Sequence, residues 1–255
     1  MARIIAVVNQ KGGVGKTTTV VNIAAYLAAA GRRVLLVDID PQGNASAGVG
    51  VQVQGEERHV YHVLLEPALA REVVRQTAVE RLATLPAHAD LAGAAVELVP
   101  LEQREFRLNQ ALESISADYD IILIDCPPSL GLLTINGLVA ADQVLIPLQA
   151  EYYALEGLGQ LMHTLNLIQT HLKPNLTVLG AVVTMYDGRS RLSGAVLEEL
   201  KKHFPNKLFQ TMIPRNVRLA EAPSYGQTIA QYDPRSRGGQ AYEALTQELI
   251  TALEQ

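Results

Sequence analysis

A glycine-rich segment near the start of the chain combines residue types that can hold a polyphosphate. It reads Gln10-Lys11-Gly12-Gly13-Val14-Gly15-Lys16-Thr17-Thr18. Apolar runs at residues 4–8 and 20–27 flank it and predict a buried strand before it and a packed helix after it. Glycines let backbone N–H groups turn toward one point, and a helix N-terminus adds partial positive charge. The context predicts a nucleotide-phosphate site, with Lys16 on the β- and γ-phosphates and the Thr17 hydroxyl on Mg²⁺.

A second lysine distinguishes this segment from the usual pattern G-x-x-x-x-G-K-[ST]. Counting back from Gly15, Gln10 stands at the first glycine position, and Lys11 follows it. A lysine there exceeds what phosphate binding requires. The form resembles the deviant Walker A motif of the ParA/MinD family of P-loop ATPases. That resemblance implies that Lys11 reaches across a nucleotide-sandwich dimer to the ATP of the partner.

Carboxylates end two predicted strands. Residues 33–38 lead into Asp38 and Asp40, and residues 120–124 lead into Asp125. Ligands of α/β proteins bind where such strand ends meet, so Asp125 is predicted to hold Mg²⁺ directly or through water. Asp38 and Asp40 can orient a water for in-line attack, or they can cap a turn or the next helix. The resemblance favours Asp40 as the residue that serves hydrolysis.

The pattern of apolar segments predicts the elements that position these groups. Strands are predicted near residues 4–8, 33–38, 82–87, 120–125, 143–148, 176–184 and 208–209, and helical spacing is seen at 20–27, 69–79, 104–117, 154–172 and before Leu253. Alternation of this kind predicts an α/β fold, a doubly wound and mostly parallel sheet with helices on both faces. With neither a linker nor an internal repeat in the sequence, we expect residues 1–255 to form one domain.

Composition excludes several classes of protein. The sequence is 48% apolar, carries a net charge of −5 and contains one cysteine, Cys126. A single cysteine excludes a disulfide framework, and two per dimer cannot supply the four ligands of an Fe–S cluster. His59, His62 and His88 show no ligand-like grouping in the sequence, so they are interpreted as surface or cap residues and no metal site is predicted there. Without an apolar run long enough to span a bilayer, we expect a cytoplasmic protein.

Charge is unevenly distributed along the chain. Residues 186–240 contain nine Lys or Arg against five Asp or Glu, which leaves this segment basic on an otherwise acidic chain. Such a surface can bind DNA phosphates weakly and without sequence preference. The same composition also describes a solvated surface whose charges happen to cluster, and composition alone does not separate the two.

Six motifs extend the resemblance over nearly the whole chain: KGGVGKTT, DIDPQGN, LIDCPPSLG, EYYALEG, IPRNVRLAEAP and YDPRSRG. Together they resemble the chromosomal Soj-type ParA proteins. The resemblance implies an ATPase with slow intrinsic turnover that uses ATP and Mg²⁺ to form a homodimer. It also implies nonspecific binding of double-stranded DNA, association with the nucleoid, and a ParB-type activator that stimulates hydrolysis and release.

The resemblance also assigns roles to residues. Catalytic roles fall to Lys11, Lys16, Asp40 and Asp125, and Mg²⁺ binding to Thr17, Asp40 and Asp125. Phosphates are bound by Gly12, Gly13, Val14, Gly15, Lys16, Thr17 and Thr18, and the adenine base by Met185, Pro214 and Asn216. DNA contacts fall to Arg189 and Arg218, with Arg191 and Arg215 as weaker candidates.

Two other functions fit part of the sequence. A MinD-like positioning ATPase acts at a membrane surface and would need a basic amphipathic C-terminal helix, whereas this one carries Glu243, Glu248 and Glu254. We therefore expect no membrane partner. A small-molecule kinase or synthetase would need a substrate pocket that the sequence does not identify.

Overall fold

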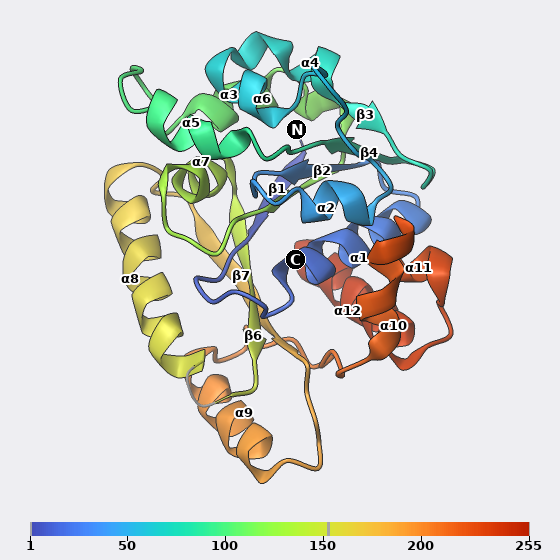
Figure 1. Cartoon of the computed structure of the whole chain (residues 1–255). Helices are drawn as coiled ribbons and strands as arrows, with labels where there is room; N and C mark the ends of the chain where they lie inside the picture. The colour runs from blue at the N-terminus through green and yellow to red at the C-terminus, as the bar shows by residue number, and fades with distance from the viewer. Residues whose placement is uncertain (1, 152–153, 255) are drawn as a thin grey trace.

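A seven-stranded sheet forms the centre of the described residues, which are 2–151 and 154–254 in this computed structural model (Figure 1). Its order is β3-β4-β2-β5-β1-β6-β7, and only β3 runs antiparallel to its neighbour. The strands are β1 (Arg3–Val7), β2 (Val34–Asp38), β3 (Arg75–Gln76), β4 (Leu82–Leu85), β5 (Ile121–Asp125), β6 (Gln143–Gln149) and β7 (Thr177–Thr184). The predicted doubly wound, mostly parallel sheet is therefore confirmed.

Helices cover both faces of the sheet, as Figure 1 shows. One face carries α3 (Val60–Leu65), α4 (Ala70–Val73), α5 (Leu91–Glu97), α6 (Arg107–Glu113), α7 (Leu132–Ala140), α8 (Ala154–His171) and α9 (Arg191–His203). The other carries α1 (Lys16–Ala29), α2 (Asn44–Gly48), α10 (Val217–Glu221), α11 (Ile229–Tyr232) and α12 (Arg237–Leu253). The remaining helical turns are 3₁₀ segments at Pro67–Leu69, Ser116–Asp118 and Ala222–Tyr225.

Strand β5 shows why the sheet is buried on both sides. Ile122 and Ile124 pack into the core under α3 to α9, whereas Ile121 and Leu123 pack into the core under α1 and α12. Successive side chains of a strand point to opposite faces, so a strand covered on both sides must be apolar at every position. The unbroken apolar run before Asp125 meets that requirement.

Register brings the functional segments to one edge. Cα of Asp125 pairs with Val7 on one side and with Asp38 on the other. Val7 leads into the glycine-rich segment, so the phosphate loop (residues 10–18) and both carboxylate-bearing strand ends meet at the carboxyl edge of the sheet. That edge, at the central strand β5 and its neighbours β1 and β2, is where open α/β sheets bind ligands.

Three expected elements differ from the structure. The helical spacing at 69–79 yields only α4, because Arg75 and Gln76 pair with β4 as the antiparallel edge strand. The helix expected over 104–117 is shortened to α6, followed by a 3₁₀ turn. Residues 208–209 form an isolated bridge from Leu208 to Ala181 instead of a strand. Tyr152 and Tyr153 of the EYYALEG motif lie outside the described residues.

Within the described ranges, each helix is either too short or too polar to cross a membrane.

Candidate functional site

The phosphate loop has a backbone that glycine favours. Gly13 has φ 73° and Gly15 has φ 85°, left-handed values that side chains with a Cβ rarely adopt. Gly15 then caps α1, whose first residues are Lys16, Thr17 and Thr18. The predicted phosphate-binding residues therefore form one turn that leads into a helix N-terminus, an arrangement that attracts anions.

The two lysines of the loop take different positions. Lys16 is only 7% exposed, and its Nζ lies 3.1 Å from the backbone oxygen of Lys11, inside the curve of the loop. The side chain of Lys11 is 38% exposed, and its Nζ forms an ion pair of 3.0 Å with Glu151 Oε2. The two ammonium groups therefore have different partners, one a backbone oxygen of the loop and the other the carboxylate of Glu151.

Thr17 and Asp125 form the predicted metal pair. The Thr17 hydroxyl donates a hydrogen bond of 2.7 Å to Asp125 Oδ2. Asp125 is fully buried, and its Oδ1 has no hydrogen-bond partner among the described residues. A buried carboxylate oxygen without a partner is costly, and a hard cation such as Mg²⁺ satisfies it. The residues present therefore fit the ion.

Asp38 and Asp40 have separate roles. Asp38 is fully buried, and its carboxylate accepts hydrogen bonds from Ser46 N, Ser46 Oγ and Asp40 N at 2.8, 2.7 and 3.1 Å. It therefore ties the end of β2 to α2 and acts as the cap that one interpretation of the sequence allowed. Asp40 Oδ1 accepts a hydrogen bond of 3.0 Å from the Gln42 N–H, and the residue is 8% exposed.

The site crowds negative charge in a buried place. Burial raises the pKa of Asp38 to about 6, and its hydrogen bonds to Ser46 oppose that shift. Burial also raises the pKa of Asp125 well above its ordinary value, and the charge of Asp38 adds to the effect. Burial lowers the pKa of Lys16, against the attraction of Asp125. A bound cation would relieve the repulsion between the carboxylates.

Two residues that the sequence analysis did not identify support the phosphate loop. The Thr184 hydroxyl, at the end of β7, donates a hydrogen bond of 2.7 Å to Val14 O. Asn9 Nδ2 donates a hydrogen bond of 2.7 Å to Pro147 O of β6, and Asn9 Oδ1 accepts one of 2.9 Å from Lys11 N. The sequence could have indicated the role of Thr184, because it is a polar residue at the end of an apolar strand.

A cavity of about 1030 Å³ lies between residues 186–189, residues 214–217 and the start of α12. Its lining includes two predicted adenine contacts, Pro214 and Asn216, together with Tyr186. Met185 is not part of the described lining, and its Sδ accepts a hydrogen bond from Gln149 Nε2 at 3.4 Å. Asn216 Oδ1 caps α10 by accepting from Arg218 N at 2.8 Å. Its amide N–H₂ is the group that remains to contact a base.

The four candidate DNA-binding arginines are exposed, but two are paired with acids. Arg189 forms an ion pair with Asp187 at 3.0 Å, which lowers the pKa of Asp187 to about 2. Arg218 pairs with Glu221 at 2.9 Å and with Asp233 at 3.5 Å. Arg189 and Arg215 both line the cavity, and Arg191 begins α9. Water screens exposed pairs of this kind so that they contribute little, and a phosphate can therefore compete for the arginines.

His59 caps α3, as one interpretation of the sequence allowed, but the structure also brings it close to a second histidine. His59 and His88 lie with Asp90 in one group whose ligand-type atoms are all within 4.8 Å of one another. Burial lowers the pKa of His59 to about 4, and the charges of His62 and His88 add to this shift. Residues some thirty positions apart gave no local signal, because the grouping depends on how α3 packs beside the end of β4.

Comparison with known proteins finds similarity along the chain. The family described as an AAA domain matches residues 2–178. The sporulation initiation inhibitor protein Soj of Bacillus subtilis is 55% identical over 249 residues, which cover 98% of each chain. The chromosome-partitioning ATPase Soj of Thermus thermophilus is 51% identical over 255 residues, covering 99% of this chain and 97% of that one. Among solved structures, the chain is similar to cobyrinic acid a,c-diamide synthase from Mycobacterium smegmatis with bound ADP and magnesium. The two are 38% identical and superpose with a TM-score of 0.87, and the match covers 100% of this chain and 96% of that one.

Proposed function

This chain belongs to the Soj/ParA family of chromosome-partitioning ATPases, and we propose that ATP switches it into a dimer that binds DNA without sequence preference. The observation that carries the proposal is the divergence of the two lysines of the phosphate loop. Lys16 points into the loop, and Lys11 stands at its outer rim. A single-subunit phosphate site uses one lysine, so the outward one is available to a second subunit.

Within one subunit, the phosphate loop binds the ATP phosphates through the backbone N–H groups of Gly12 to Thr18. Lys16 leaves the carbonyl oxygen of Lys11 and pairs with the β- and γ-phosphates. Thr17 and Asp125 hold Mg²⁺, which supplies charge neutralisation for phosphoryl transfer. Asp40, whose backbone is fixed by Asp38, orients the attacking water. Met185, Pro214 and Asn216 accommodate the adenine base next to the cavity.

Dimerisation uses Lys11. The ion pair with Glu151 holds its ammonium group about one hydrogen-bond length from a carboxylate, so the lysine must exchange this partner for the γ-phosphate of the opposite subunit. That exchange replaces one negative group by a more highly charged one. Hydrolysis removes the γ-phosphate and returns Lys11 to Glu151. ATP therefore favours the dimer, and ADP favours the separate chains.

DNA binding follows from pairing two weak basic surfaces. Arg189 and Arg218, with Arg191 and Arg215 beside them in the basic segment, contact phosphates. Each subunit alone binds weakly, since its arginines are partly neutralised by Asp187 and Glu221. Two surfaces joined in one body gain from effective concentration, so affinity rises when the dimer forms. The protein is then associated with the nucleoid, and a ParB-type partner accelerates its otherwise slow hydrolysis and release.

The proposal takes residues 1–255 as one domain. The C-terminal helix α12 packs on α1, the helix that follows the phosphate loop, and the hydroxyls of Tyr242 and Thr19 lie 3.1 Å apart in this contact. Because the last helix supports the first, the two ends of the chain fold together.

Sedimentation of the protein with ATP, ADP or no nucleotide tests the switch. We expect a dimer only with ATP, and a more persistent one in Asp40→Ala, which hydrolyses slowly. Lys11→Ala should bind ATP as a monomer, whereas Lys16→Ala should lose ATP binding itself. The matched control is Lys202→Ala, an exposed lysine of α9. A Lys11→Ala variant that dimerises like the wild type would refute the proposed role.

A further inference from the structure

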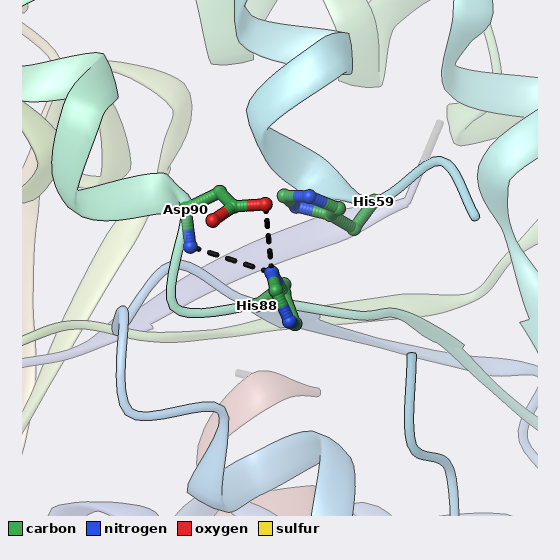
Figure 2. Close-up of side chains that lie close together, drawn as sticks. All are labelled: His59, His88 and Asp90. Carbon is green, nitrogen blue, oxygen red and sulfur yellow. Dashed lines mark hydrogen bonds and ion pairs between the residues drawn. The ribbon is translucent and has the colours of Figure 1, made fainter. Parts of the chain in front are cut away.

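The group formed by His59, His88 and Asp90 lies outside the nucleotide site. Figure 2 shows the His59 ring, from the residue before α3, turned toward the Asp90 carboxylate, with His88 beside both. His88 and Asp90 lie in the segment between β4 and α5. The ring centroids of His59 and His88 are 5.2 Å apart. Two separate segments of the chain therefore contribute three metal-ligating side chains to one place.

His59 is a buried imidazole with unused capacity. Its side chain is 2% exposed, and Nδ1 has no hydrogen-bond partner among the described residues. A polar nitrogen in that position costs free energy unless a proton donor or a cation satisfies it. His62 forms a capping box with His59 at the start of α3, in which His62 Nδ1 accepts the backbone N–H of His59 at 3.2 Å. The backbone N–H of His62 faces the His59 side chain in return, but it is too poorly placed to satisfy Nδ1.

The contact between His88 and Asp90 shows that two of the ligand atoms already lie close together. His88 Nδ1 lies 3.0 Å from Asp90 Oδ2, and the backbone N–H of Asp90 also points at the same nitrogen, at 3.4 Å (Figure 2). Nδ1 carries a proton in this pair and donates it to Asp90 Oδ2, so a divalent cation would bind here by replacing that proton. The cation would then bond both to the nitrogen and to the carboxylate oxygen.

The geometry points to a binding site for a divalent transition-metal ion of the zinc type, held by His59, His88 and Asp90 and completed by water. Two imidazoles and one carboxylate form a ligand set that Zn²⁺ uses with an open fourth position. Zn²⁺ bonds of about 2.0–2.1 Å place tetrahedral ligand atoms roughly 3.3 Å apart. All the candidate atoms already lie within 4.8 Å, and the exposed Asp90 side chain can close the remainder by rotation.

The ion would fasten the β4–α5 segment to the start of α3. These segments already meet through Val60 N–H and Pro86 O at 2.9 Å. In the same segment, Ala87 N donates a hydrogen bond of 3.0 Å to Ser46 Oγ, and the Ser46 hydroxyl donates one to Asp38. Binding therefore stabilises the fold beside the segment that carries Asp40, without entering the nucleotide site.

Equilibrium dialysis of the full chain against Zn²⁺, in excess Mg²⁺ and without nucleotide, tests the site. Mg²⁺ occupies the oxygen ligands of the nucleotide site and leaves the histidine site to Zn²⁺. We expect one tightly bound Zn²⁺ per wild-type chain. His88→Gln and Asp90→Asn should each weaken binding at least tenfold, whereas His163→Gln, an exposed histidine of α8, should leave it unchanged.

Thermal unfolding provides a second measurement. At Zn²⁺ about a hundredfold above its dissociation constant, the wild-type Tm should rise by roughly 5 °C, and Asp90→Asn should lose that rise. Asp90 is exposed, so this variant should fold like the wild type. Three results would each overturn the site: Zn²⁺ binding only at millimolar concentration, equal binding by the wild type and a His88→Gln, Asp90→Asn double variant, or an equal loss in His163→Gln.

Discussion

Replacing Asp125 by asparagine should stabilise the nucleotide-free protein while removing its function. The Asp125 carboxylate is fully buried next to Asp38, and one of its oxygens has no partner among the described residues. Asparagine keeps an acceptor for the Thr17 hydroxyl and removes the negative charge that burial and Asp38 disfavour, although it places an amide N–H₂, itself a strong donor, where the unpartnered oxygen was. A buried charge without a counter-ion costs more than a buried neutral amide, so Asp125→Asn should raise the free energy of unfolding by about 1–3 kcal/mol.

The pH dependence identifies the cause. The native pKa of Asp125 is raised above the ordinary 3.8, so the carboxylate lowers stability at pH values above its native pKa and has no effect below the unfolded one. The advantage of the variant should therefore be largest near pH 8 and should shrink as the pH falls toward 4. For a chain of this size, about 1–3 kcal/mol corresponds to a Tm rise of roughly 3–10 °C at pH 8.

Calorimetry or circular dichroism without nucleotide and Mg²⁺ measures the effect. The matched control is Asp118→Asn, an exposed carboxylate paired with Arg71, which should change stability by less than about 1 kcal/mol. Mg²⁺ with ADP should stabilise the wild type strongly and the variant little, because Asp125 is a proposed ligand of the ion. A variant no more stable than the wild type at pH 8, or an advantage that persists at pH 4, would refute the reasoning.

Two further substitutions test separate parts of the account. Glu151→Gln removes the 3.0 Å ion pair that holds Lys11, an exposed interaction worth up to about 1 kcal/mol. The ATP-dependent dimer, measured by sedimentation, should therefore tighten by up to roughly fivefold. A weaker dimer would contradict the exchange mechanism. Gly238→Ala places a Cβ 2.6 Å from Leu219 Cγ, so the free energy of unfolding, measured with urea, should fall by about 1–3 kcal/mol. The control is Gly194→Ala, whose Cβ meets nothing within 4 Å and which should be neutral or stabilising.

The sequence predicted the parts of the site that depend on neighbouring residues. The phosphate loop needs a strand, glycines and a helix in succession, and all three are local. Asp125 was predictable because parallel strands that are buried on both faces bring their carboxyl ends to one edge. The apolar run of β5 therefore placed its terminal carboxylate without any knowledge of the register.

Other features depend on contacts between distant segments. The ion pair of Lys11 with Glu151 joins residues 140 positions apart. The structural role of Asp38 depends on the packing of α2, which presents Ser46 to it. Residues 75–76 were expected to be helical because their apolar neighbours have helical spacing, but pairing with β4 prevailed over that local preference. Such contacts have no periodic signal in a single sequence.

The central claim is that ATP controls DNA binding, and the most direct test is binding to random-sequence duplex DNA at moderate salt. Wild type and Asp40→Ala are compared with ATP, ADP and no nucleotide, together with Arg189→Glu, Arg218→Glu and the control Arg58→Glu, an exposed arginine outside the basic segment. We predict binding only with ATP, stronger in Asp40→Ala, weakened by reversal at Arg189 or Arg218 and unchanged in the control. If the protein binds ATP but ignores DNA in every nucleotide state, the basic segment is only a solvated surface, and a membrane-surface or small-molecule synthetase role takes precedence.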